Sequence, residues 1–237
     1  MTSAVVVGPM QEMALADALA WENACLTDTV AGRCTANAQL WSCEPALVAP
    51  ARMSRLPGFD RACARAADAG WPIHLRATGG DLVPQGPGIV NLTLVFQGRQ
   101  GAISGLEATY RRLTAPIHRA LSDAGITSRH GSVSGAFCDG RFNVTVLGRK
   151  FAGTAQRWCP MAGGHAVQAH AMMLMRTPDD NTIATLNRFY DDCGIVRVIY
   201  ASAHVGLQDL VPKCEARVAQ SRFLRMIAVS SFLKSGE

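Results

Sequence analysis

The feature that most constrains the fold is a strand-like run that ends in a basic turn and continues into small residues. Residues 142–147 are rich in apolar and β-branched side chains, and Gly148, Arg149 and Lys150 follow directly. Glycine and other small residues let a ligand approach the backbone closely. The small residues that follow the lysine include Gly153, Thr154 and Ala155. The segment predicts a turn after a strand, at which a lysine can meet the carboxylate or phosphate group of a ligand.

Composition bounds the class of protein. The chain has 237 residues, of which 49% are hydrophobic and 17% charged, enough to bury the core of an α/β or α+β domain. The net charge of +5 suits an acidic partner or a phosphate-bearing ligand. We expect no nucleic-acid partner, because the chain has no run of basic residues. The N-terminus has no basic region and no apolar run is long enough for a membrane span, so we expect a cytoplasmic protein without a membrane partner.

The eight cysteines do not predict a metal site. They occupy positions 25, 34, 43, 63, 138, 159, 193 and 214, and no two form a Cys-x-x-Cys pair. Reduced, buried thiols that pack as small hydrophobes are the simplest interpretation for most of them. Cys138 and Cys193 are the two cysteines with a candidate chemical role.

Hydrophobic periodicity predicts a mixed sheet with helices on one or both sides. We expect helices over residues 10–30, 60–69, 106–124, 179–190 and 213–233. We expect strands over residues 38–43, 72–76, 88–96, 142–147, 166–175 and 196–200. The strands at 142–147 and 166–175 are predicted to pair with each other, flanking the Lys150 turn.

A second motif lies upstream of the lysine. It runs from Arg76 through Thr78, Gly79 and Gly80 to Asp81, and it comes directly after a predicted strand. Two glycines after a strand permit a positive φ and bring backbone N–H groups close to a ligand. On its own such a string is often only a tight surface turn, so a functional interpretation depends on the lysine segment described first.

Together, the two motifs resemble the catalytic domain shared by lipoate-protein ligases, octanoyltransferases and biotin ligases. The chain departs from the family pattern at Asp81, where a third glycine is usual, and at Gln85, where histidine is usual. The resemblance implies a class II synthetase-like α/β domain with a mixed sheet. It implies one catalytic domain over residues 1–237, without the C-terminal accessory domain that many bacterial ligases carry.

The resemblance also implies roles for individual residues. Lys150 is expected to contact the acyl carbonyl and, in a ligase, the adenylate phosphate. His170, in the strand after the lysine, is expected to line the pocket. The remaining expected binding residues are Arg76, Thr78, Gly79, Gly80, Gly153, Thr154 and Ala155.

Three functions remain open at this point. The first is a lipoate-protein ligase that activates lipoate or octanoate with ATP and Mg²⁺. It would pass the acyl group to a lysine of a lipoyl domain, in a 2-oxoacid dehydrogenase subunit or a glycine-cleavage H-type protein. The second is a thiol-dependent octanoyl or lipoyl transferase that takes its acyl group from acyl carrier protein or from another lipoyl domain.

In the transferase, Cys138 or Cys193 would carry the acyl group as a thioester. Two acidic residues precede Cys193 and would disfavour its thiolate. The third function is a degenerate domain that only binds a lipoyl domain, or half of a ligase completed by a separate accessory chain. Biotin ligation is less favoured, because the usual Gly-Arg-Gly-Arg type of loop is absent.

Overall fold

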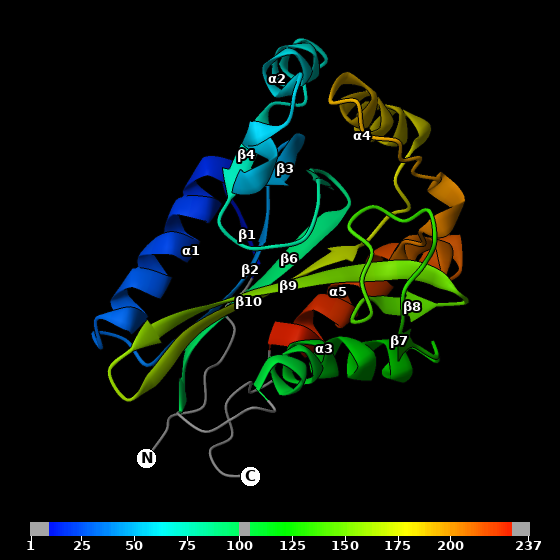
Figure 1. Cartoon of the computed structure of the whole chain (residues 1–237). Helices are drawn as coiled ribbons and strands as arrows, with labels where there is room; N and C mark the ends of the chain where they lie inside the picture. The colour runs from blue at the N-terminus through cyan, green and yellow to red at the C-terminus, as the bar shows by residue number, and fades with distance from the viewer. Residues whose placement is uncertain (1–9, 100–104, 229–237) are drawn as a thin grey trace.

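The computed structural model describes residues 10–99 and 105–228, and its centre is a seven-stranded mixed sheet (Figure 1). Its β1–β2 pair is parallel and its other pairs are antiparallel. The strands in spatial order are β1 (Gln11–Glu12), β2 (Ala36–Ser42), β6 (Ile89–Arg99), β10 (Gly164–Leu174), β9 (Arg149–Met161), β8 (Val144–Val146) and β7 (Arg129–His130). The predicted α/β class with a mixed sheet is confirmed.

Helices cover both faces of this sheet (Figure 1). Helices α3 (Gly105–Asp123) and α5 (Ala216–Ala228) pack on one face and share a core with the strands. Helix α1 (Leu15–Val30) packs against β6 and β10 on the other face. Side chains of a strand alternate between faces. The side chains of Leu92 and Leu94 join the α3–α5 core, so those of Asn91, Thr93 and Val95 face α1.

A smaller sheet, in the order β4-β3-β5, lies at one end of the large one. It contains β3 (Ala46–Pro50), β4 (Ile73–Arg76) and β5 (Val83–Gln85). Helices α2 (Phe59–Asp68) and α4 (Asp180–Asp192) contact each other and share a second core with this sheet. The predicted glycine motif follows β4, so it lies where the two sheets meet.

The predicted pairing of residues 142–147 with 166–175 is wrong. Strand β9 lies between β8 and β10, and Lys150 is its second residue rather than part of a turn. The turn before β9 is formed by Leu147 and Gly148, which have φ of +51° and +74°. The chain then continues at once as a strand, because β10 pairs with it from Ala152 to Met161.

Two other expectations differ from the structure, and part of a third lies outside the described residues. Residues 196–200 are not a strand: the Asn187 side chain bonds the backbone N–H and carbonyl of Ile199 at 2.8 and 3.0 Å. The first helix begins at Leu15 rather than at residue 10, and the Glu44 carboxylate accepts from the Leu15 N–H at 3.1 Å. The last helix is described to Ala228, and residues 229–233 of the predicted range lie outside the described part.

Candidate functional site

Two rows of side chains, running across four strands of the large sheet, form the floor of a pocket. Register places each residue of a row opposite the next, on the face that α1 covers. The first row is Trp41, Asn91, Met172 and Gly153, and the second is Gln39, Thr93, His170 and Ala155. All of these but Gln39 and Thr93 line the pocket itself.

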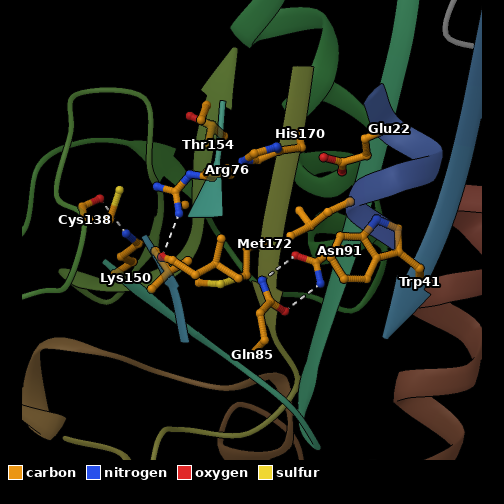
Figure 2. A pocket seen from close by; sticks show the side chains of 15 residues that line it. Glu22, Trp41, Arg76, Gln85, Asn91, Cys138, Lys150, Thr154, His170 and Met172 are labelled. Carbon is orange, nitrogen blue, oxygen red and sulfur yellow. Dashed lines mark hydrogen bonds between the residues drawn. The ribbon is translucent and has the colours of Figure 1, made fainter. Parts of the chain in front are cut away.

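The walls come from α1, the small sheet, the loop before β8 and two residues of β9 (Figure 2). They are formed by Leu19, Glu22, Val48, Val83, Gln85, Arg76, Cys138, Lys150 and Thr154. Seven residues singled out from the sequence line this pocket: Arg76, Cys138, Lys150, Gly153, Thr154, Ala155 and His170. Motifs far apart in the chain therefore meet at one cavity.

Lys150 is completely buried at the head of the pocket. Its Nζ donates to the carbonyl oxygens of Phe137 at 2.6 Å and of Cys138 at 2.8 Å, and it lies 4.9 Å from the Phe137 ring centroid. Burial lowers the pKa of this lysine to about 8 because it penalises the charged form. An ammonium has three N–H donors, so one remains for a ligand.

Gly153 provides the space that the lysine occupies. A Cβ at this position would lie 2.9 Å from Lys150 Nζ and 3.0 Å from its Cε. We expect Gly153→Ala to displace the ammonium, because such contacts are shorter than van der Waals packing allows. Steady-state transfer assays should show at least a ten-fold loss. Gly140→Ala is the control, because a Cβ there meets open space, and it should change the rate little. Gly163→Ala is unsuitable, because that glycine has φ of +80°.

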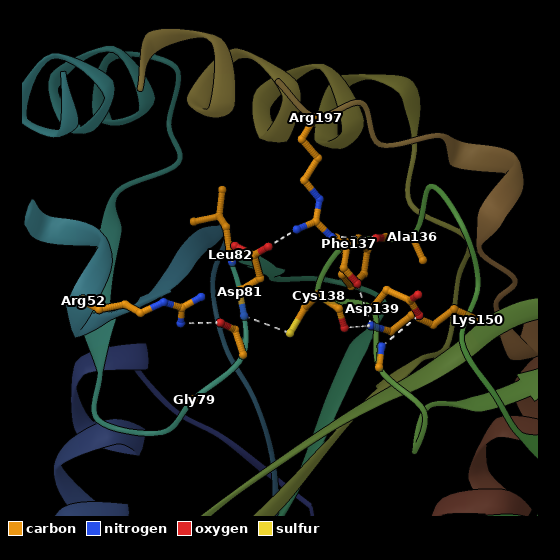
Figure 3. A network of polar contacts seen from close by, with 12 residues as sticks. Arg52, Gly79, Asp81, Leu82, Ala136, Phe137, Cys138, Asp139, Lys150 and Arg197 are labelled. Atoms are coloured by element: carbon orange, nitrogen blue, oxygen red, sulfur yellow. Dashed lines mark hydrogen bonds and ion pairs between the residues drawn. The ribbon is translucent and has the colours of Figure 1, made fainter. Parts of the chain in front are cut away.

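The Cys138 thiol lies beside the glycine turn (Figure 3). Its Sγ accepts a hydrogen bond from the Asp81 N–H at 3.1 Å. A Cβ on Gly80 would lie 2.8 Å from Sγ, so glycine at this position lets the turn approach the sulfur. Cys138 itself has φ of +43°, a conformation that costs energy for a residue with a side chain. The loop therefore holds this thiol in a specific orientation.

Arg76 holds the glycine turn in place. Its Nη1 donates to the Val48 carbonyl at 2.9 Å, and its Nη2 donates to the carbonyls of Asp81 at 2.6 Å and Gly79 at 3.2 Å. Burial lowers the pKa of the guanidinium. Thr78 is buried, does not line the pocket, and its Oγ1 has no hydrogen-bond partner among the described residues. This motif thus shapes the pocket wall mainly through its backbone.

The two departures from the family pattern each have a partner. The Asp81 carboxylate forms an ion pair with Arg197 (Figure 3), and Asp81 does not line the pocket. The Gln85 side chain forms a reciprocal amide pair with Asn91, at 2.8 and 3.2 Å (Figure 2). The acidic residue is therefore directed toward Arg197, while the glutamine adds a polar group to the pocket.

Sequence reasoning missed Glu22, which is 4% exposed. Its carboxyl accepts from Thr93 Oγ1 at 2.5 Å and from Gln168 Nε2 at 2.8 Å. Trp41 Nε1 in turn donates to Thr93 Oγ1 at 3.0 Å. The helical spacing of the sequence could have indicated its burial. Glu22 lies on the same face of α1 as the other buried residues of that helix, which are Leu15, Ala18, Cys25, Leu26 and Thr29.

The Glu22 carboxyl predicts a pH dependence of stability. Burial raises its pKa from 4.5 to about 7, so the folded state keeps a proton that the unfolded chain loses between these values. The contribution of Glu22 to the free energy of unfolding is therefore full below about pH 4.5 and is lost as the pH rises through about 7. Glu22→Gln should remove this loss, which is on the order of 3 kcal/mol.

Urea unfolding of both proteins at pH 5 and pH 8 measures the difference. Glu12→Gln, at an exposed position, is the matched control and should keep the wild-type dependence. An unchanged pH dependence in Glu22→Gln would contradict the assignment.

His170 lies between the two ends of the pocket (Figure 2). Burial and the nearby Arg76 charge lower its pKa to about 3, so the imidazole is neutral. Its ring nitrogens form no hydrogen bond with any residue in the described ranges 10–99 and 105–228. A neutral imidazole has one donor and one acceptor, and both are free to meet a ligand.

Cys193 lies outside the pocket. It follows α4 and packs in the second core, where burial raises the pKa of its thiol. Of the two candidate nucleophiles, only Cys138 lines the pocket. The described residues contain no group of three His, Cys, Asp or Glu side chains that could hold a metal ion. None of the helices described is long and apolar enough to cross a membrane.

Comparison with known proteins identifies the family. The family model of the lipoyl protein ligase A/B catalytic domain matches residues 14–206. The chain belongs to this family. Among curated relatives, an uncharacterised protein of Cupriavidus necator is 38% identical over 164 residues, which are 64% of this chain and 65% of that protein. An octanoyl-[GcvH]:protein N-octanoyltransferase of Kyrpidia tusciae is 36% identical over 180 residues, 71% of this chain and 60% of that one.

The alignments thus span less than two thirds of these relatives. Among solved structures, lipoate-protein ligase A bound with ATP has a TM-score of 0.66 at 16% identity, covering 99% of this chain and 89% of that one. At this identity the likeness shows the fold, which agrees with the fold expected for the family.

Proposed function

We propose that this chain is an acyltransferase that moves an octanoyl or lipoyl group between lipoyl-type proteins through a thioester on Cys138. One observation carries the proposal: the Cys138 thiol lines the same pocket as the Lys150 ammonium, which donates to the backbone carbonyl of Cys138. A nucleophilic thiol next to a cation is the arrangement that covalent acyl transfer needs.

In the first half-reaction, Cys138 Sγ attacks the acyl carbonyl carbon of the donor. The new C–S bond forms, the bond from the carbonyl to the donor lysine nitrogen breaks, and that nitrogen takes up a proton and leaves as an amine. In the second half-reaction, the neutral amine of an acceptor lysine attacks the thioester. The C–N bond forms, the C–S bond breaks, the amine gives up a proton to solvent, and Cys138 leaves as its thiolate.

Lys150 would stabilise the negative charge that forms on the carbonyl oxygen in both steps. Two of its N–H groups are bonded to the Phe137 and Cys138 carbonyls, which fix the direction of the third. A donor held in place in a buried site costs no reorganisation when charge develops. The backbone N–H of Asp81, which donates to Sγ, would stabilise the thiolate before the first half-reaction and after the second.

The names of the relatives support a particular donor. The Kyrpidia enzyme is named for transfer from octanoyl-[GcvH] to another protein, so we propose an H-type protein as donor and a lipoyl domain as acceptor. The net charge of +5 suits acidic carrier proteins of this kind. The Asp81 and Gln85 departures both have structural partners, which favours a working enzyme over a degenerate binding subunit.

A ligase that uses ATP and Mg²⁺ is the second candidate. The observation that favours it is the presence of two cations, Arg76 and Lys150, at one pocket, where they could meet an adenylate phosphate. Acyl carrier protein is a further possible donor, and the donor experiment includes it.

The donor experiment measures the intact mass of an apo lipoyl domain after incubation with the protein and one acyl source. The sources are octanoylated H-type protein, octanoyl-acyl carrier protein, and free octanoate or lipoate with ATP and Mg²⁺. We expect an octanoyl mass gain from the first source without ATP. A gain only from the free acid with ATP would establish the ligase and remove Cys138 from the mechanism.

A further inference from the structure

The acyl pocket has a mostly apolar lining, but it also carries polar side chains that an alkyl chain does not need. Besides the groups assigned to catalysis, it is lined by the side chains of Glu22, Gln85, Asn91 and His170. Burying a polar group against an apolar chain, without a hydrogen bond, costs free energy. A pocket that held only methylene groups would leave several of these polar atoms without water and without a partner.

The Gln85–Asn91 pair leaves polar atoms unused. The two amides are 5% and 3% exposed, and their reciprocal pair uses one N–H and one acceptor of each. A carboxamide has two N–H donors and an oxygen with two lone pairs. Each amide therefore keeps one donor, and neither forms a hydrogen bond with any other residue of the described chain.

His170 is the second group with unused atoms, and it lies close to the pair. Asn91 is opposite Met172 and Thr93 is opposite His170 in the β6–β10 register, so Asn91 and His170 are diagonal neighbours on one face. Such neighbours are roughly 7–8 Å apart at the backbone, a gap that a small polar group between their side chains can bridge. Both ring nitrogens of His170 are free, as described above.

The charges on either side favour a neutral group. Figure 2 shows Cys138 and Lys150 at one side of the pocket and Glu22 at the other, with Arg76 and His170 between them. A cation placed between would approach the Arg76 guanidinium, and an anion would approach the Glu22 carboxyl, which carries a negative charge above about pH 7. A neutral hydrogen-bonding group avoids both repulsions.

We propose that the pocket selects an acyl group with a neutral hydrogen-bonding substituent in its chain, such as a hydroxyl, recognised by His170 and the Gln85–Asn91 pair. This inference rests on the proposed acyl-transfer function, and it names a substrate class more polar than octanoate. The substituent would lie beyond the carbonyl that Lys150 contacts, on the side of the pocket toward Glu22.

Binding of free acids by calorimetry tests the inference without any transfer step. The probes are octanoate and a series of octanoates hydroxylated at each chain carbon in turn. We expect at least one hydroxyoctanoate to bind about ten-fold more tightly than octanoate, as one or two added hydrogen bonds would give. Equal or weaker binding of every hydroxyoctanoate would overturn the inference, as would absence of binding by all acids.

Two variants locate the preference. The first is Gln85→Met, which has a similar length but no amide, and the second is His170→Phe. Each should bring the ratio of the dissociation constants for octanoate and for the preferred hydroxyoctanoate close to one. Gln97→Met makes the same replacement at an exposed position outside the pocket and should keep the wild-type ratio. A preference that survives both pocket variants would contradict the assignment to these side chains.

The inference and the proposed function fail in different ways. A protein that transfers octanoyl groups but binds all the acids alike would keep its function and lose the inference. A protein that prefers a hydroxyoctanoate but transfers nothing would keep the polar pocket and lose the acyltransferase.

Discussion

Replacing Cys138 with alanine abolishes acyl transfer to an apo lipoyl domain. The rate should fall by roughly a thousand-fold or more, because the thioester can no longer form. The loss should fall on kcat rather than on donor binding, since the carbonyl and chain still meet Lys150 and the pocket floor. Steady-state assays with octanoylated H-type protein measure it, and intact mass of the wild-type enzyme should show an octanoyl adduct that the variant lacks.

Cys193→Ala is the matched control for the cysteine experiment. Its thiol lies in the second core, away from the pocket, so this variant should lose some stability and keep its specific activity. Retention of near-normal transfer by Cys138→Ala, or an adduct that forms on Cys193 instead, would contradict the proposed mechanism.

Lys150→Met should lower the transfer rate by about a hundred- to a thousand-fold, the cost of removing one preorganised donor from an oxyanion site. Methionine fills the space of the lysine stem without its charge. The variant should also lose stability, because the carbonyls of Phe137 and Cys138 lose their donor, at roughly 1–3 kcal/mol for a buried group left unpaired. Transfer assays combined with urea unfolding separate these two effects.

The pH dependence of the wild-type enzyme is a second measurement of the same residue. The ammonium form is required for charge stabilisation, and burial lowers its pKa to about 8. The lysine-dependent part of the rate should therefore be present below this pH and be lost as pH rises through it. A Lys150→Met enzyme as active as the wild type, or a rate that is insensitive to pH between 7 and 9.5, would contradict the role.

Local sequence motifs contain several of the residues that line the pocket. Arg76, Lys150, Gly153 and His170 stand in recognisable strings, and all four line the pocket. The partners of these residues could not be predicted in the same way. The Gln85–Asn91 pair depends on the approach of the small sheet to the large one, and no spacing in the chain encodes that approach.

Two errors in the strands show where local patterns mislead. Residues 196–200 are rich in β-branched and aromatic side chains, as strands are, yet the Asn187 side chain bonds the backbone groups of Ile199. The small residues after Lys150 have low strand propensity, but pairing with β8 and β10 on both sides makes them a strand. Tertiary contacts decided both cases.

The order of the strands has a consequence for how the protein is made. The pocket floor joins β2, β6, β10 and β9, whose order in space differs from their order along the chain. Strand β10 lies between β6 and β9. During synthesis, the pocket floor therefore cannot be completed before residues 164–174 have left the ribosome. Contacts between distant segments form slowly. Asn91 and Thr93 on β6 have partners in Gln85, Glu22 and Trp41, which are synthesised before them, whereas their neighbours in β10 become available only when most of the chain has been synthesised.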